Sequence, residues 1–168
     1  MLTLINSRQS VRAWKNKKVP AAAVKKILEA GMNAPSAGNQ RPWHFVVVTG
    51  KELLEKISAI HPYGAFTRNA PCAILVCGDT GLEKYKGFWV QDCSAAMENM
   101  LLAAHALKLG GVWTGIYPLA DRVKNFTRLF KLPQGVVPLA LLPFGTPAAP
   151  LAKRASRYDS GRVHHNSW

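Results

Sequence analysis

The sequence predicts a fold of mixed α and β structure built around one hydrophobic core. Two observations support this prediction. Apolar stripes at helical spacing alternate along the chain with short runs of β-branched and aromatic residues. Of the 168 residues, 48% are hydrophobic and only 18% are charged, which is enough apolar material for a core. No repeat, low-complexity stretch or interdomain linker interrupts the pattern, so we expect a single domain over residues 1–168.

The first half of the chain contains two predicted helices and two predicted strands. A helix is expected to begin at Pro20 and to end at Pro35, with Val24, Ile27, Leu28 and Met32 on one apolar stripe. The other three elements are a strand over Trp43–Thr49 closed by Gly50, a helix over 51–60, and a strand over Cys72–Cys77 whose unbroken apolar run predicts burial on both faces.

The second half is dominated by a long helix, predicted from Phe88 to Leu109. Apolar residues cover most of its circumference, so it should run through the core or lie against another subunit. Gly110 and Gly111 are expected to end it with a left-handed stop. The remaining predicted elements are a strand over 112–116, a helix over 121–130, a strand over 136–144, and a polar, basic tail after Gly145 that is unsuited to a core.

The chain carries a large basic excess, with 22 Lys and Arg against 9 Asp and Glu and a net charge of +13. The basic residues are dispersed, and the densest runs, Lys15–Lys18 and Lys153–Arg157, are short. A solvated basic face is the simplest interpretation, and part of the charge could steer anionic nucleotides inward. A basic module that binds nucleic acid or an anionic surface is a weak alternative, because clustered cations with interleaved aromatic residues are missing.

The cysteines and the chain start predict a cytoplasmic protein. Cys72, Cys77 and Cys93 are odd in number, form no Cys-x-x-Cys pair and sit in apolar surroundings, so buried thiols in a reducing compartment are expected and a zinc site is not. Residues 1–6 lack the features of a signal peptide, and no apolar run approaches the roughly 20 residues that span a bilayer.

Two distant segments read as halves of one site for a phosphorylated aromatic cofactor. The first, residues 8–14, has the sequence RQSVRAW and places Arg8, Ser10 and Arg12 at alternate positions, which share one side of an extended chain. The second, residues 34–43, has the sequence APSAGNQRPW and is a loop punctuated by Gly and Pro with short hydrogen-bonding side chains.

Together these segments resemble the FMN-dependent nitroreductase family, and three further blocks extend the resemblance over nearly the whole chain. They are the helix around 91–104, the segment 110–118 and the ending 157–168. The resemblance implies an α+β three-layer sandwich, in which a central mixed, mainly antiparallel sheet is flanked by helices. It also implies an intertwined homodimer with shared sites for tightly bound, non-covalent FMN, and a tail, 146–168, that completes the phosphate site and packs on the partner.

The resemblance assigns roles to the first segment and to the tail. Arg8 and Arg157 would hold the FMN phosphate, because guanidinium groups match phosphate oxygens. Ser10 would bond near the ribityl chain, beside Gln9. Arg12 would approach the pyrimidine edge, where a cation stabilises the negative charge that two-electron reduction creates.

One position departs from the family pattern. A second basic residue often lies two places before the C-terminal Arg, and this chain has Ala155 there. Arg154 or Lys153 would then substitute, and the sequence leaves open which of them does.

Two other sets of residues would contact the ring. Thr114 and Gly115 match positions whose backbone N–H groups point at N5 and O4, and the missing side chain of Gly115 leaves one ring face open for hydride transfer. The family loop that reaches the flavin of the other subunit is matched by Pro35, Ser36, Ala37 and Asn39.

The resemblance implies an enzyme that passes hydride from NADH or NADPH through flavin N5 to nitroaromatic, quinone or similar electrophilic acceptors. The missing Gly-x-Gly-x-x-Gly predicts that the nicotinamide binds transiently over the flavin, with ping-pong kinetics.

The protein need supply no acid or base, so His44, His61 and His105 need no catalytic role, and His105 is expected as a hydrogen-bonded core residue. Specialised flavin enzymes of the same fold, dehalogenases or flavin-fragmenting enzymes, are the alternative. Candidates for the pocket rim are Tyr63, Phe66 and Phe126.

Overall fold

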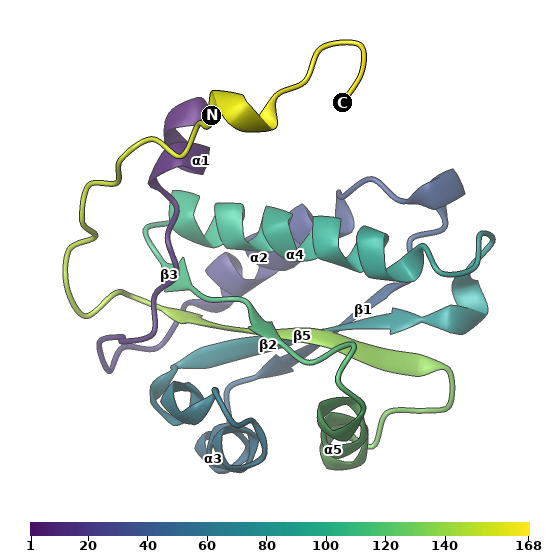
Figure 1. Cartoon of the computed structure of the whole chain (residues 1–168). Helices are drawn as coiled ribbons and strands as arrows, with labels where there is room; N and C mark the ends of the chain where they lie inside the picture. The colour runs from purple at the N-terminus through teal and green to yellow at the C-terminus, as the bar shows by residue number, and fades with distance from the viewer.

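The computed structural model describes residues 1–168 and has three layers (Figure 1). A sheet forms the middle layer. One face is covered by α2 (Ala21–Met32) and α4 (Trp89–Ala106), and the other by α3 (Lys51–Ile60) and α5 (Ala120–Phe130). A short helix, α1 (Leu2–Ser7), lies above α4, and both chain termini are on that side. The predicted α+β sandwich is confirmed.

The sheet is antiparallel throughout. Its order is β1-β2-β5-β3, with β4 also paired to β5. The strands are β1 (Trp43–Val48), β2 (Cys72–Asp79), β3 (Gly110–Gly111), β4 (Thr114–Gly115) and β5 (Val136–Gly145). Single 3-10 turns are η1 (Ala37–Asn39), η2 (Ala65–Asn69), η3 (Thr80–Leu82) and η4 (Ser160–Arg162).

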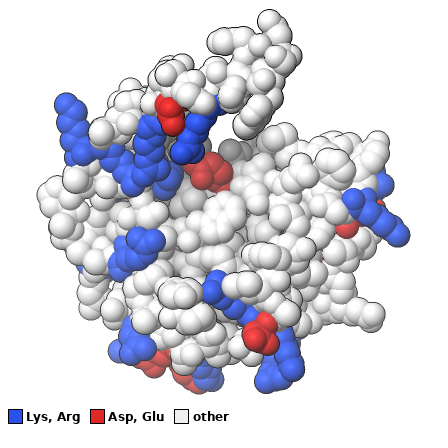
Figure 2. Space-filling model, viewed as in Figure 1, with Lys and Arg blue, Asp and Glu red and all other residues white.

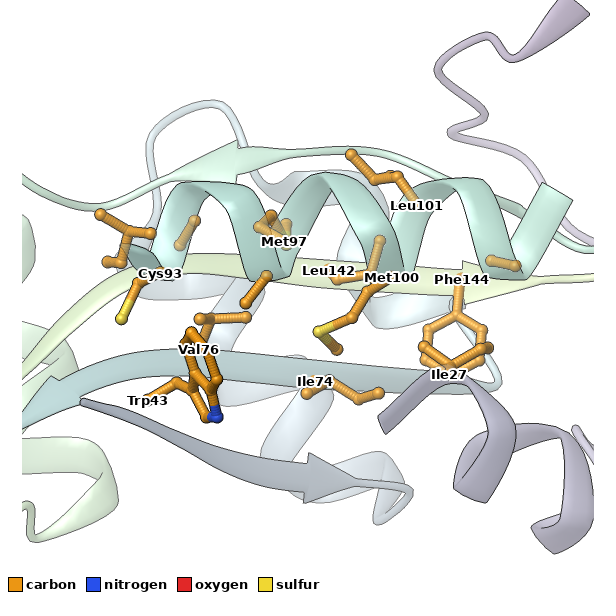
Figure 3. Close-up of a cluster of buried hydrophobic side chains, with 14 of the residues drawn as sticks. Ile27, Trp43, Ile74, Val76, Cys93, Met97, Met100, Leu101, Leu142 and Phe144 are labelled. Atoms are coloured by element: carbon orange, nitrogen blue, oxygen red, sulfur yellow. The ribbon is translucent and has the colours of Figure 1, made fainter. Parts of the chain in front are cut away.

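The core lies on both faces of the sheet, as the apolar run of β2 predicts. On one face, Met97 and Met100 of α4 pack over Ile74 of β2 and Leu142 of β5 (Figure 3). On the other, alternate residues of β2 such as Leu75 join the cluster beneath α3 and α5. Each large side chain buried in this way contributes about 1.5–3 kcal/mol. The sheet is therefore fixed between two apolar layers.

The segment after α4 differs from its prediction. The left-handed residue that ends the helix is Lys108, at φ 61°, and Gly110 and Gly111 form β3 instead of a stop. These glycines allow close packing: a Cβ on Gly110 would lie 2.4 Å from Val11 Cγ2, and one on Gly111 would lie 2.7 Å from Leu142 Cδ1. The expected strand over 112–116 is correspondingly reduced to two residues.

The same glycines hold the N-terminal segment at the edge of the sheet. The Val11 N–H donates to the Gly111 carbonyl at 3.0 Å, and the Trp14 indole N–H donates to the Gly110 carbonyl at 2.7 Å. The Ala148 N–H donates to the Ala13 carbonyl at 3.0 Å, which brings the start of the tail alongside. The first segment and the tail, distant in sequence, are therefore neighbours.

The three thiols are buried and unpaired, as predicted. Burial raises the pKa of Cys72, Cys77 and Cys93 to about 12, so they remain protonated near neutral pH. None of the helices is both long and apolar enough to pass through a membrane.

Candidate functional site

A small pocket of about 190 Å³ opens at the edge of the sheet beside β4. Its walls include Arg12 of the N-terminal segment, Thr114 and Gly115 of β4, and Arg122 of α5. The sequence predicted three of these four residues for one ring site, and the structure brings them together. Tyr63 and Phe66, expected at the rim, also line this pocket.

The backbone of Gly115 faces this pocket because of the β4–β5 register. The Val112 N–H bonds to the Pro143 carbonyl at 3.3 Å and the Ile116 N–H bonds to the Leu139 carbonyl at 3.0 Å. Antiparallel pairing alternates along a strand, so the intervening Gly115 directs both its N–H and its C=O away from β5. Its N–H thus lies at the open edge, and a Cβ built there would meet no atom within 4 Å.

The carbonyl of Gly115 is held from outside the sheet. It lies 2.9 Å from His61 Nε2 and accepts a second hydrogen bond, also 2.9 Å, from Arg122 Nη1. Neither residue was predicted as part of the site: His61 was expected to need no catalytic role, and Arg122 was not singled out. Their only sequence signals are a His at the end of one helix and an Arg in the first turn of another, neither of which is specific.

The pocket is cationic, and aromatic rings orient its charges. Arg12 lies over the ring of Phe66 at 5.8 Å, and Arg122 lies over the ring of Tyr63 at 5.5 Å. No carboxylate lines the pocket. It therefore suits a ligand whose edge carries electron-rich or negatively charged atoms.

Thr114 adds a second feature at this wall. Its side chain is only 5% exposed, and its hydroxyl oxygen is buried without a hydrogen-bond partner. A buried hydroxyl without a partner carries a free-energy cost, so such groups in native proteins call for an explanation such as a bound group.

A second pocket, of about 620 Å³, lies where the tail crosses the N-terminal segment. Arg8, Arg154 and Arg157 line it together with Ala155. Lys and Arg side chains gather at the upper left of Figure 2, on the side where these segments run in Figure 1. Guanidinium groups match the oxygens of a phosphate, so the chemistry of this cavity suits that group.

Contacts within this pocket distinguish the positions of the two residues considered as substitutes at Ala155. Arg154 Nη1 donates to the Arg8 carbonyl at 3.3 Å, so Arg154 stands beside Arg8. Desolvation, followed by the charges of Arg157 and Arg8, lowers the pKa of the Arg154 guanidinium. Arg8 Nε is 3.5 Å from Glu98 Oε1, the nearest compensating charge. Of the two substitutes considered, Arg154 is the one that lines the pocket.

Gln9 and Ser10 lie between the two pockets along the chain. The Gln9 side chain donates to the Ala152 carbonyl at 2.8 Å and thereby ties the tail to the N-terminal segment. Ser10 is exposed. Gln9 thus supports the site through the backbone of the tail.

The loop from Pro35 to Asn39 lies elsewhere, near the start of α4 (Figure 1). Asp92, buried in the first turn of that helix, accepts the Ala37 N–H at 2.9 Å and the Gln40 side-chain amide at 2.6 Å. Within one protomer the loop, which includes Ser36, lines neither cationic pocket. The buried carboxylate nevertheless fixes its shape.

Two expectations about individual side chains are wrong. Phe126, a candidate for the rim, is fully buried and packs edge-on to His61 with ring centroids 6.1 Å apart. His105 is hydrogen-bonded, with Nε2 2.7 Å from the Ser7 hydroxyl, but it is half-buried at the surface of α4 instead of in the core. The unpredicted helix α1 supplies that partner.

Comparisons with known proteins agree with this fold. The model of the Nitroreductase family matches residues 5–62 and 58–146. A protein of Methanothermobacter thermautotrophicus, named "Putative NADH dehydrogenase/NAD(P)H nitroreductase", is 51% identical over 168 residues, which are 100% of this chain and 87% of that protein.

Solved structures share the fold at lower sequence identity. An FMN-dependent nitroreductase of Clostridium difficile R20291 superposes with a TM-score of 0.92 at 29% identity, over 100% of both chains. A protein of Desulfovibrio desulfuricans described as a "putative nitroreductase in complex with fmn" superposes at 0.85 with 31% identity, over 99% of this chain and 96% of that one.

Proposed function

Because this chain belongs to the nitroreductase family of oxidoreductases, we propose that it binds FMN and passes hydride from NADH or NADPH to nitroaromatic, quinone or similar electrophilic acceptors. One observation carries the proposal. A pocket lined by three arginines and a cationic pocket with a free strand edge lie at opposite ends of one segment, residues 8–12. FMN has a phosphate at one end and a ring with hydrogen-bond acceptors at the other.

The phosphate end fits the residues present. Arg8, Arg154 and Arg157 would hold the phosphate, with Arg154 in the place of the family's second basic residue. Arg8 now pairs with the half-exposed Glu98, 3.5 Å away, and would give up this ion pair for the phosphate or share itself between the two. Ser10 would meet the ribityl chain between the pockets.

The ring end fits as well. The Gly115 N–H lies at the open edge of β4, the space above its Cα is empty, and the Thr114 hydroxyl is buried without a partner. Arg12, held over Phe66, would place its positive charge at the pyrimidine edge. When bound, FMN supplies the redox chemistry, accepting hydride from the nicotinamide and giving it to the acceptor.

The residues around the ring pocket bind and orient; they need not transfer protons. The pocket contains no carboxylate, and its histidine, His61, is engaged with Gly115. Reductant and acceptor would use the same open side of the site in turn, which predicts ping-pong kinetics.

The proposed active form is a homodimer. The pocket at β4 holds only about 190 Å³, which leaves a ring largely uncovered within one protomer. Asp92 fixes the loop that contains Pro35, Ser36, Ala37 and Asn39 away from the protomer's own pockets, and in the proposed dimer this loop would cover the partner's ring. Large apolar side chains also remain exposed on α1, before α4 and in the tail, including Leu2, Phe88 and Trp168.

The test is to purify the protein, add FMN and look for flavin absorbance near roughly 450 nm. Under anaerobic conditions, NADH and NADPH are then compared as reductants, and a panel of nitroaromatic, quinone and halogenated acceptors follows. Sedimentation of the flavin-loaded protein reports its oligomeric state. Failure to bind FMN would refute the proposal, and a flavin-loaded monomer would refute the shared site.

A further inference from the structure

The buried histidine His61 is held in one protonation state by its backbone contacts. It is 3% exposed and follows α3 directly. The Tyr63 N–H points at Nδ1, 3.2 Å away, while Nε2 is 2.9 Å from the Gly115 carbonyl. A backbone N–H can only donate and a carbonyl can only accept, so the neutral ring with its proton on Nε2 is the form that satisfies both contacts.

Packing leaves this ring little freedom. Phe126 of α5 meets it edge-on, with an interplanar angle of 86°. On the other side, a Cβ on Gly64 would lie 2.8 Å from His61 Cβ, so the close turn at 61–64 accepts only glycine there. Desolvation lowers the pKa of His61, which favours the neutral ring near pH 7. The hydrogen bond to Gly115 raises this pKa, and the nearby charge of Arg122 lowers it.

Arg122 is the second donor to the same carbonyl, at 2.9 Å, and Tyr63 stacks against its guanidinium. One acceptor therefore joins the end of α3 to the start of α5. Both donors reach it from outside the sheet, on the side of β4 that has no neighbouring strand.

Gly115 needs such anchors. It belongs to a two-residue strand, has no side chain to pack, and is free to rotate more than any other residue type. Its flanking residues are held by β5, but its own N–H and C=O point away from β5. The Gly115 carbonyl shares a peptide plane with the Ile116 N–H, which donates to the Leu139 carbonyl at 3.0 Å. A donor on the Gly115 carbonyl therefore holds this plane from its outer edge and limits the rotation of the glycine that would turn its own N–H away.

We propose that His61 is a positioning residue for the cofactor: with Arg122 it clamps the Gly115 carbonyl and so directs the Gly115 N–H at the ring of the bound flavin. This role rests on the proposed FMN function. His61 transfers no proton and touches no substrate. It acts through the glycine, which it approaches across 54 residues of sequence.

The first measurement is made without cofactor. Nitrogen-15 spectra of the imidazole rings in the flavin-free protein should show His61 as the neutral tautomer protonated on Nε2, and the amide signal of Gly115 should shift in His61→Phe. A ring protonated on Nδ1, or an unchanged Gly115 amide, would overturn the clamp whether or not the protein uses flavin.

The second measurement uses the FMN-loaded protein and three variants. His61→Phe keeps a planar apolar ring but removes the donor, and His61→Gln restores an N–H at the end of a side chain. His44→Phe is the matched control, because His44 lies exposed on β1 and contacts Asp79 instead of the site.

We expect His61→Phe to bind FMN about tenfold more weakly and to shift its two-electron midpoint potential. If the substitution changes the affinities for oxidised and reduced FMN by factors that differ tenfold, the midpoint potential shifts by about 30 mV. His61→Gln should recover most of both losses, and His44→Phe should match the unmodified protein. The inference would be overturned if His61→Phe bound FMN within twofold of the unmodified protein and had a midpoint potential within a few millivolts of it. Absence of FMN binding by the unmodified protein would instead count against the proposed function.

Discussion

Replacing Gly115 by alanine separates the role of the strand edge in binding from its role in folding. The new methyl group would meet no atom within 4 Å, and the backbone at Gly115 is not in the left-handed region. The substitution should therefore leave stability unchanged or raise it by about 0.4–1 kcal/mol through the lost freedom of the unfolded chain. The methyl group would instead occupy space at the edge where the ring is proposed to lie.

The matched control is Gly111→Ala, three residues before β4. Its Cβ would approach Leu142 Cδ1 to 2.7 Å and both Phe144 Cβ and the Pro143 carbonyl to 3.2 Å. Overpacking of this kind costs about 1–3 kcal/mol. For a chain of this size each kcal/mol lowers the melting temperature by about 2–4 °C.

The assay compares melting of the flavin-free proteins with FMN affinity measured by fluorescence titration. Gly115→Ala should melt at or slightly above the unmodified protein and bind FMN at least tenfold more weakly, a loss of about 1.4 kcal/mol. Gly111→Ala should melt several degrees lower. The reasoning is refuted if Gly115→Ala binds FMN normally, or if it destabilises the flavin-free protein as much as Gly111→Ala.

Three other outcomes are expected. Arg157→Ala should weaken FMN binding at least tenfold yet leave riboflavin binding unchanged, because only FMN carries the phosphate. The control is Arg162→Ala, which removes an arginine whose partner is Asp159. An equal effect of Arg157→Ala on FMN and riboflavin binding would contradict the phosphate site. Asp92→Asn should cost about 1–3 kcal/mol in urea denaturation, because the two donors meet different carboxylate oxygens and the substitution turns one of these acceptors into an NH2 donor. It should also raise hydrogen exchange at residues 36–40, and unchanged exchange would argue against Asp92 as the anchor. The lowered pKa values of His61 and His105 mean that the unfolded chain binds protons first, so stability should be constant well above about pH 6.5 and fall as the pH drops below it. A shallower fall in His61→Phe than in the unmodified protein would assign part of the effect to His61, and equal slopes would exclude His61 as a source.

Periodicity and residue type in the sequence were enough to predict the main elements. The stripe containing Ile27 became α2, and the unbroken apolar run after Cys72 became a strand with core on both faces. These predictions succeed because burial pattern is a local consequence of helical or strand repeat. The resemblance to the nitroreductase family, confirmed by the family match, also depends on residues that can be read in order.

The cationic segments were likewise visible in the sequence. Arg8, Arg12 and Arg157 were assigned to the cofactor by the resemblance to the family, because guanidinium groups match the oxygens of a phosphate. Which residue replaces the missing cation at Ala155 was not visible. It depends on the path of the tail, which hydrogen bonds to the N-terminal segment fix.

Only the tertiary structure decided the details that make β4 a site. Gly110 and Gly111 are needed for the close approach of Val11 and Leu142, contacts that a local pattern cannot show, and so they were mistaken for a helix stop. His61 meets Gly115 because the β4–β5 register turns that glycine outward and two helices on the same face bring donors to its carbonyl. Sequence determines which groups are available along each element. The pairing of distant strands determines where they point, because register and packing are settled by the whole chain at once.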